Sequence, residues 1–419
     1  MDVDDESARI AIAKQIDWYD RDFRTRTEYE VYEAARGVAP QRSDRTGEWY
    51  MLGYEDARGA FQRPGLFRNS LQRVGEEMGR IPAYPVNTDD DVHREYRRML
   101  MPLFTARRMA TLEGAMRKYA QELLAPLAGQ PAADLALGFT VPFPAGSFCR
   151  LMGFPAEDYA HLLRWKDAYL NANSPQIAAS FGITDFRPDG RPALAAAHEL
   201  SLRTGVEVSA YLRPLIAQRQ ADPRDDLLTE LVRLRHTDGT PLTDDELVSI
   251  CFNLFLGGLD TVSGTLSMVV RHFAVNPADR DRFVERAGDD ERAARAVEEL
   301  MRFHSIVAMP RRVADTTTFR GADLQAGDAV WLVTPAANRD PAQFVDAASL
   351  DYDRWPNPHL GFGSGVHRCL GIHLARLEMR IALQELHRAI PGYRLDPGNP
   401  PVVGSGAQRG LLSLPVLLG

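Results

Sequence analysis

Cys369 stands in a glycine-rich segment, residues 362–371, which reads Phe-Gly-Ser-Gly-Val-His-Arg-Cys-Leu-Gly. Glycines let backbone amides bend toward a sulfur and let a flat ligand approach the chain closely. The amphipathic pattern of residues 373–390 predicts a helix just after the cysteine, and its first amides favour the thiolate. A single thiolate held in this way suits axial ligation of iron, because anionic sulfur pushes electron density toward the metal.

Two other roles for this cysteine follow from the residues alone. A buried cysteine in a glycine-rich turn would serve packing only. A nucleophilic cysteine needs a base and a group that orients the base, and the sequence offers no identifiable pair for Cys369. Cys149 and Cys251 are widely separated from it, so the spacings of disulfide scaffolds and common zinc sites are absent.

A long helix is predicted to follow Thr243. Thr243 and Glu246 form a capping box, an apolar run extends to His272, and Asn276-Pro277 predicts the end. Such a helix has about 30 residues and is about 45 Å long at its regular rise per residue. An interior helix of this length is unusual in a soluble protein, so we expect other elements to be arranged around it.

The middle of this helix contains Gly257, Gly258, Asp260 and Thr261. Two adjacent glycines cost about 2 kcal/mol relative to alanine in a helix interior, and Asp and Thr side chains compete for backbone hydrogen bonds. One interpretation is a close crossing with another helix. The other is a bulged helix with space above a cofactor.

Two shorter helical segments carry charged residues at helical spacing. Residues 92–101 place His93 and Arg97 on one face at i,i+4, which also fits a solvated basic face. The segment near residues 291–304 contains Glu299 and Arg302 at i,i+3. By default that spacing predicts an ordinary surface ion pair.

The overall composition is that of a soluble globular protein. The chain has 419 residues, 45% of them hydrophobic and 25% charged, with a net charge of −8 that argues against nucleic acid as the main partner. The first residues are acidic and lack the apolar core of a signal peptide, and no uncharged apolar run reaches membrane-spanning length. We therefore expect a cytoplasmic monomer in a reducing compartment, with no membrane attachment.

Together these four features resemble the cytochrome P450 family. The cysteine segment matches the pattern Phe-Gly-x-Gly-x-(basic)-x-Cys-x-Gly with His367 at the basic position, and all four features follow the family's order over essentially the whole chain. The detail is most similar to bacterial camphor-hydroxylase-like members, which share Gly-Gly-Leu-Asp-Thr. One departure is Asp91-Val92, where the family usually has proline before the histidine.

The resemblance implies the cytochrome P450 fold in one domain, residues 1–419. This fold is mainly α with small β-sheets, a triangular helical prism with a long central helix over haem. The β-rich part is expected at roughly 40–60, 310–335 and 393–419, and the helical part at roughly 90–305 and 372–390.

The resemblance also implies haem b (iron protoporphyrin IX) as cofactor, with Cys369 as the iron ligand and Phe362 packed beside the sulfur. The groups expected to bind the propionates are His93, Arg97, Arg311 and His367. The buried salt-bridge network expected beneath the haem consists of Glu299, Arg302 and Arg354. The remaining expected haem contacts are Phe104, Gly257, Gly258, Gly363, Gly371 and Ala375.

The implied reaction uses O2 as co-substrate. Asp260 and Thr261 match the acid–alcohol pair that delivers protons to bound dioxygen, which favours oxygen activation over peroxide-driven variants. No flavin or nicotinamide fingerprint is present, so electrons should come from a separate ferredoxin with its reductase. Arg94, Arg98 and Arg376 are candidates to steer that donor, and an equally good interpretation is that they are ordinary solvated arginines.

The substrate is expected to be a small to medium hydrophobic molecule, such as a terpenoid-like or natural-product intermediate, held largely by shape. Two amides among the expected pocket residues suggest an oxygen or amide group on the substrate, although they also fit bonds to backbone or water. The pocket residues are Ile81, Val86, Asn253, Leu256, Gly257, Val307, Met309, Ala407 and Gln408. Alternatives are an atypical oxidation (C–C coupling or dealkylation) and a non-catalytic haem-thiolate sensor, which would not need Asp260 and Thr261.

Overall fold

The computed structural model describes residues 6–18, 20, 28–35, 37–69, 81–172, 174–187, 192–404 and 409–419. The chain divides into two compact units, each assembled from separate stretches of sequence. The first unit comprises residues 1–72, 87–90 and 294–369, and the second comprises residues 73–86, 91–293 and 370–419. Because the chain passes repeatedly between them, neither unit corresponds to one continuous segment.

The first unit is built on a five-stranded sheet with the order β1-β2-β8-β5-β3. Its elements are α1 (Glu6–Ala13), α2 (Glu28–Ala34), β1 (Gln41–Arg42), β2 (Trp49–Met51), α3 (Tyr54–Phe61), β3 (Phe67–Arg68), β5 (Ala308–Val313), β6 (Thr317–Phe319), β7 (Ala322–Leu324), β8 (Ala329–Val333), α15 (Thr334–Ala337) and η5 (Gly365–His367), with most of α14 (Asp290–Phe303). β2 and β8 are parallel, and the other neighbours are antiparallel.

Alternation along β8 separates two cores on the faces of this sheet. Val330 and Leu332 pack with residues of α3, whereas Trp331 and Val333 pack with residues of α1 and α2. Both faces are therefore covered by helices, and the sheet provides a rigid base for the loops that follow β5 and β8.

The second unit is mainly helical, with two small sheets, β4-β12-β9 and β10-β11. Its helices are α4 (Asp90–Leu100), η2 (Met101–Phe104), α5 (Ala106–Ala110), α6 (Glu113–Leu124), η3 (Ala136–Thr140), α7 (Pro142–Met152), η4 (Ala156–Asp158), α8 (Tyr159–Leu170), α9 (Pro175–Ser180), α10 (Leu194–Ala221), α11 (Leu227–Val232), α12 (Asp244–Val275), α13 (Pro277–Ala287) and α16 (Ile372–Ala389). Its strands are β4 (Ala132–Asp134), β9 (Tyr393–Leu395), β10 (Val402–Val403), β11 (Leu411–Ser413) and β12 (Pro415–Leu418).

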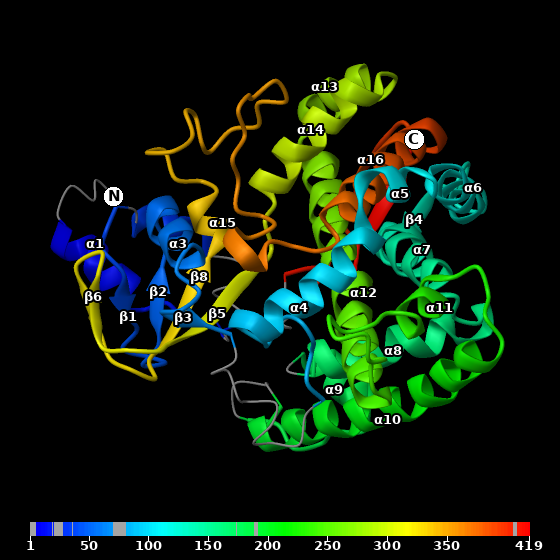
Figure 1. The fold of residues 1–419 in the computed structure, drawn as a ribbon. Helices are drawn as coiled ribbons and strands as arrows, with labels where there is room; N and C mark the ends of the chain where they lie inside the picture. Colours follow the sequence, from blue (N-terminus) through cyan, green and yellow to red (C-terminus); the bar gives the residue numbers. More distant parts are fainter. Residues whose placement is uncertain are drawn as a thin grey trace. The chain divides into compact units, whose positions relative to one another are not determined.

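The long helix α12 is the centre of the second unit, where it packs against α7, α8, α10 and α16 (Figure 1). The predicted capping box is confirmed: Thr243 accepts from the Glu246 amide, and the Glu246 carboxylate accepts from the Thr243 amide at 2.7 Å. α12 is long and apolar enough to cross a membrane by composition, but 67% of its most apolar window is buried inside the protein. That burial is what a core helix shows.

The mainly α architecture with small sheets is confirmed, and two local predictions are wrong. α12 remains α-helical throughout, so the bulge expected near Gly257 is not formed. β6 and β7 form a hairpin whose turn, Arg320-Gly321, has positive φ at both residues. β4 lies within the part predicted to be helical, because its backbone pairs with the distant strand β12.

Candidate functional site

The loop that carries Cys369 belongs to the first unit, and its shape depends on glycine. Gly363 and Gly365 have φ of 67° and 70°, in the left-handed region that favours glycine. A Cβ at Gly365 would lie 2.5 Å from the carbonyl oxygen of Phe61, so no other residue fits there. The Cys369 amide donates to the Phe362 carbonyl at 2.9 Å, and the thiol is exposed. The sulfur is therefore both positioned and accessible.

A buried acid lies beside this loop. The Asp89 carboxylate is 3.2 Å from Nε2 of His367 and 3.5 Å from Nε of Arg68, and its side chain is 1% exposed. In the sequence Asp89 was only part of an acidic run that opens a helix, so its pairing with His367 was not predicted. The pairing orients the imidazole two residues before Cys369.

Arg311 on β5 is a buried cation that lacks a close acid. Its guanidinium donates to the Pro310 carbonyl at 2.8 Å, and within the described residues no carboxylate forms an ion pair with it. Burial lowers the pKa of Arg311 to about 10, although the charge of Asp89 opposes this shift. A buried guanidinium with unused donors is a fitting partner for a ligand carboxylate. The donor set of this unit, one exposed sulfur and one such cation, therefore fits a haem with its propionates.

Glu299 and Arg302 on α14 form a buried pair, so the default interpretation of a surface pair is wrong. The Arg302 guanidinium lies 2.7 Å from Glu299 Oε1, and Arg354 lies 3.2 Å from Glu299 Oε2. Arg302 also donates to the carbonyls of Asn338, Ala347 and Ser349. The network therefore fixes the segment that leads into the cysteine loop.

In the second unit, the two central glycines of α12 face different surroundings. A Cβ at Gly258 would lie 2.4 Å from the Phe148 ring of α7, whereas a Cβ at Gly257 would meet open space. Gly258 thus permits a close helix crossing, one of the two interpretations drawn from the sequence. Gly257 leaves a neighbouring face of α12 clear, and the Thr261 hydroxyl donates to the Gly257 carbonyl at 2.8 Å.

Asp260 is held by a lysine that the sequence did not single out. Lys166 Nζ on α8 lies 3.0 Å from Asp260 Oδ1 and 2.6 Å from Asp167 Oδ1, and its side chain is 5% exposed. Burial alone would lower the pKa of Lys166, but the two carboxylates outweigh it and raise the pKa. Lys166 is one of only three lysines in the chain, and its place in an apolar helix was the only available signal.

A cavity of about 70 Å³ adjoins this ion pair. Its lining includes Lys166, Asp167, Asn171, Asp260, Ser263 and Leu411. The lining is largely apolar, but a space of this size accommodates ordered water where the polar side chains of Lys166, Asp167, Asn171, Asp260 and Ser263 face it. Water therefore has access to the Asp260 carboxylate from this side of α12.

The remaining predicted residues fall into three groups. His93, Phe104 and Ala375 are buried and Arg97 is half-buried, while a Cβ at Gly371 would meet open space. Six predicted pocket residues besides Gly257 are described and none of them is fully buried: Ile81, Val86, Asn253, Leu256, Val307 and Met309. Ala407 and Gln408 lie outside the described residues.

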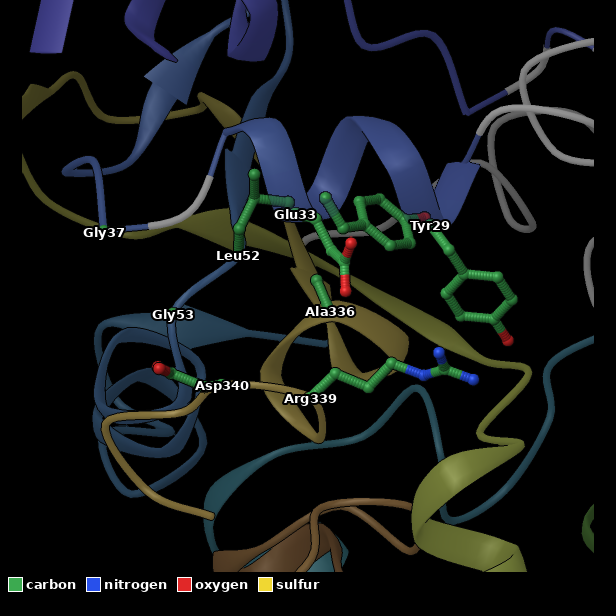
Figure 2. A pocket seen from close by; sticks show the side chains of 9 residues that line it. Tyr29, Glu33, Gly37, Leu52, Gly53, Ala336, Arg339 and Asp340 are labelled. Atoms are coloured by element: carbon green, nitrogen blue, oxygen red, sulfur yellow. The ribbon is translucent and has the colours of Figure 1, made fainter. Parts of the chain in front are cut away.

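A second hollow lies in the first unit beside α2 and α15, where Arg339 and Tyr29 converge (Figure 2). Its volume is about 20 Å³, which is room for about one water molecule. The Arg339 guanidinium carbon is 4.0 Å from the centroid of Tyr29 and 3.8 Å from that of Phe303. This is aromatic packing around an arginine, and it contributes nothing to the sites above.

Comparison with known proteins gives consistent matches along the chain. The sequence model described as Cytochrome P450 matches residues 49–285 and 293–389. Mycinamicin IV hydroxylase/epoxidase of Micromonospora griseorubida is 34% identical over 381 residues, 88% of this chain and 89% of that protein. The methyl-branched lipid omega-hydroxylase of Mycobacterium bovis is 31% identical over 354 residues, 82% and 78% of the two chains.

Solved structures agree with these sequence matches. The post-tailoring hydroxylase HmtN, involved in himastatin biosynthesis, superposes with a TM-score of 0.77 at 28% identity, covering 94% of this chain and 97% of that one. The similarity therefore extends over nearly the whole chain.

Replacing Gly365 with alanine should reduce the free energy of unfolding by about 2–4 kcal/mol, because the substitution combines a positive φ with a backbone clash. Urea unfolding measures the loss. Gly288→Ala is the control, since Gly288 has a φ of −77° and a Cβ there meets nothing within 4 Å. Equal stability of the two variants would contradict the requirement for glycine at position 365.

Replacing Glu299 with glutamine should reduce the free energy of unfolding by about 3–5 kcal/mol, because two arginines would lose their buried counter-charge. Glu55→Gln removes an exposed partner of Arg58 and Arg320 and should change stability by less than about 0.5 kcal/mol. Thermal unfolding of both variants side by side decides between a buried network and a dispensable pair.

Proposed function

The chain belongs to the cytochrome P450 family and is a monooxygenase, and we propose that it hydroxylates a hydrophobic natural-product intermediate. The observation that carries the proposal is the Asp260–Thr261 pair on α12, with Asp260 held by Lys166 beside a cavity that water can enter. A haem protein that only carried or sensed a ligand would need no such arrangement. Relatives named as a mycinamicin IV hydroxylase/epoxidase and a methyl-branched lipid omega-hydroxylase support a hydrophobic substrate.

Cys369 is the residue that would ligate the iron of haem b, and Arg311 and His367 of the first unit would bind a propionate. His93 and Arg97 on α4 are propionate partners that the resemblance to the family suggests. The bound haem supplies the activation of dioxygen and the insertion of one oxygen atom into the substrate. Arg311 supports this assignment most directly, because its buried guanidinium has donors to spare. Asp89 keeps the His367 ring oriented through the contact at Nε2.

Proton delivery is assigned to Asp260 and Thr261. The carboxylate of Asp260 can take a proton from water in the adjoining cavity, and the protonated Lys166 keeps that carboxylate from rotating away. The Thr261 hydroxyl donates its hydrogen to the Gly257 carbonyl, so the lone pairs of the hydroxyl oxygen remain available to accept hydrogen bonds. Asp260 therefore takes up protons from water, and Thr261 accepts a hydrogen bond from the next group in the chain of proton transfer.

The proposed apolar substrate contacts are Leu256 on α12 in the second unit and, in the first unit, Val307 and Met309, all partly exposed. Asn253 on α12 is the proposed polar contact. The Asn253 side chain makes no hydrogen bond to the described part of the chain, so its amide has both donor and acceptor available. We therefore assign it to an oxygen or amide group of the substrate. Hydroxylation close to a polar group fits a natural-product intermediate better than a simple hydrocarbon.

Electrons are assigned to a separate ferredoxin and its reductase, because no flavin or nicotinamide fingerprint occurs in the sequence. Arg94 is highly exposed and, among the described residues, forms an ion pair with Asp91 alone, so it remains accessible to an acidic donor. Arg98 is instead engaged with Thr237 at 2.8 Å. The proposed setting is a cytoplasmic monomer that needs neither membrane nor nucleic acid.

The reduced protein with carbon monoxide should give the difference spectrum of thiolate-ligated haem, and Cys369→Ser should abolish that spectrum because the hydroxyl is not a thiolate. Cys149→Ser is the matched control. Burial raises the pKa of the Cys149 thiol to about 12, so this cysteine is inert and its loss should leave the spectrum unchanged. A thiolate spectrum that survives in Cys369→Ser would refute the ligand assignment.

Hydrophobic natural-product intermediates should shift the ferric haem to high spin and gain one oxygen atom when a ferredoxin system supplies electrons. Asp260→Asn should lower that turnover by about a hundredfold while peroxide release per electron rises. Asp281→Asn, at an exposed position of α13, is the control and should behave like the unaltered protein. Normal coupling in Asp260→Asn would remove the proton-delivery role.

A further inference from the structure

His236 lies in a tight turn between α11 and α12 that brings two helices together. The turn is closed by a bridge between Arg235 and Pro241, the His236 amide donates to the Thr240 carbonyl at 2.9 Å, and Gly239 takes a φ of +86°. This geometry holds the imidazole at a fixed place near the first turn of α12.

Both ring nitrogens of His236 face carboxylates. Nδ1 lies 3.2 Å from Glu95 Oε1 on α4, and Nε2 lies 3.1 Å from Glu246 Oε1 on α12. A neutral imidazole has one N–H and one lone pair, so it can satisfy only one of the two acids. The charged imidazolium has two N–H groups and satisfies both.

The same carboxylates extend the connection to the segment before α4. Tyr96 donates its hydroxyl to Glu246 Oε1 at 2.7 Å, and Tyr84 stacks on Tyr96 with centroids 4.9 Å apart and an interplanar angle of 24°. Residues 81–86 therefore pack through Tyr84 against the Tyr96 ring. The hydroxyl of that ring is fixed by Glu246, the acid that also contacts His236. This segment contains two of the predicted pocket residues.

We propose that His236, in its charged form, is a positioning residue that fastens α4 and residues 81–86 to the first turn of α12 and so limits how often that segment opens. The link to substrate entry rests on the proposed function, because it takes this segment as part of the pocket wall. The fastening itself rests only on the contacts within the second unit.

The other ionisable groups around the ring keep one charge state near neutral pH. Glu95 has a lowered pKa, chiefly through the hydrogen bond from the Thr237 amide. Burial opposes ionisation of Glu246, but hydrogen bonds from Tyr96, Thr243 and His236 lower its pKa. The charged or titratable groups that face the ring are Glu95, Tyr96 and Arg98 on α4, Glu246 on α12, and Asp238 in the turn.

The direction of the pH effect follows from His236. Burial alone would lower the pKa of His236, but the hydrogen bonds and charges of Glu246 and Glu95 outweigh it and raise the pKa. A raised pKa means that the stabilisation is complete below the ordinary histidine value of about 6.5 and is lost as the pH rises through the value in the folded protein. The segment should accordingly open more often in mildly alkaline solution.

Hydrogen exchange of the haem-loaded protein tests the fastening. After correction for intrinsic rates, opening of residues 81–86 and of α4 should increase about fivefold between about pH 6 and about pH 9. His236→Gln should open at the higher level at both pH values, and His236→Arg, with a permanent charge and a donor fork, should stay at the lower level at both. A wild-type pH response that persists in both variants would overturn the proposal.

His272→Gln is the matched control, since His272 also pairs with a carboxylate, Asp279, at 2.8 Å near the other end of α12. This variant should keep the pH response of residues 81–86. Loss of the response in His272→Gln would mean that the effect is a general loosening of the helix, and the assignment to His236 would fail.

Entry into the pocket is read separately from the rate at which 4-phenylimidazole binds the ferric haem. The ratio of the rate in His272→Gln to the rate in His236→Arg should rise with pH, because the ligand's own titration cancels when two variants are compared at the same pH. Parallel rates in the two variants would overturn the link to entry. Absence of any haem signal would instead count against the proposed function, and hydrogen exchange would still decide the fastening.

Discussion

The buried ion pair between Glu299 and Arg302 is the interaction on which the first unit depends. Arg302 joins α14 to three carbonyls of the segment after α15, and Glu299 accepts from Arg354 and the Asp351 amide in the same segment. This stretch has little regular structure of its own, so its path is determined by these hydrogen bonds. The cysteine loop begins where that path ends, and its geometry therefore derives from charges that have no contact with solvent.

Three buried cations of the chain differ in how their charge is balanced. Arg302 has its full set of acceptors and is structural. Lys166 pairs with two carboxylates beside a cavity. Burying its ammonium group costs hydration free energy, and the ion pair fixes the position of the Asp260 carboxylate. Arg311 has no close acid among the described residues, and an anionic ligand would complete it. The missing ion-pair partner of Arg311 among the described residues, rather than its burial alone, is what supports the proposed role in binding an anionic ligand.

Local patterns predicted the elements well, whereas contacts between distant residues were not accessible from the sequence. The capping box at Thr243 and the glycine pattern before Cys369 each determine geometry within a few residues, so both were predictable. Lys166 and Asp89 contact residues that are far away in the sequence, and no local residue spacing predicts such contacts. The bulge expected at Gly257 failed because the glycine pair serves two different sides of one regular helix, one of them a close contact with Phe148.

A continuous α12 has a consequence for how its parts act together. Glu246 and Asp260 lie on one unbroken helix, about 21 Å apart along its axis at the usual rise. One turn beyond Asp260, Gly264 allows the backbone of Gly410 to approach so closely that a Cβ at Gly410 would lie 3.1 Å from the Cα of Gly264. A helix fixed at these points moves as one body, since bending it would break either the capped first turn or this close contact. The groups that fasten its first turn and the acid at its centre therefore share one rigid frame.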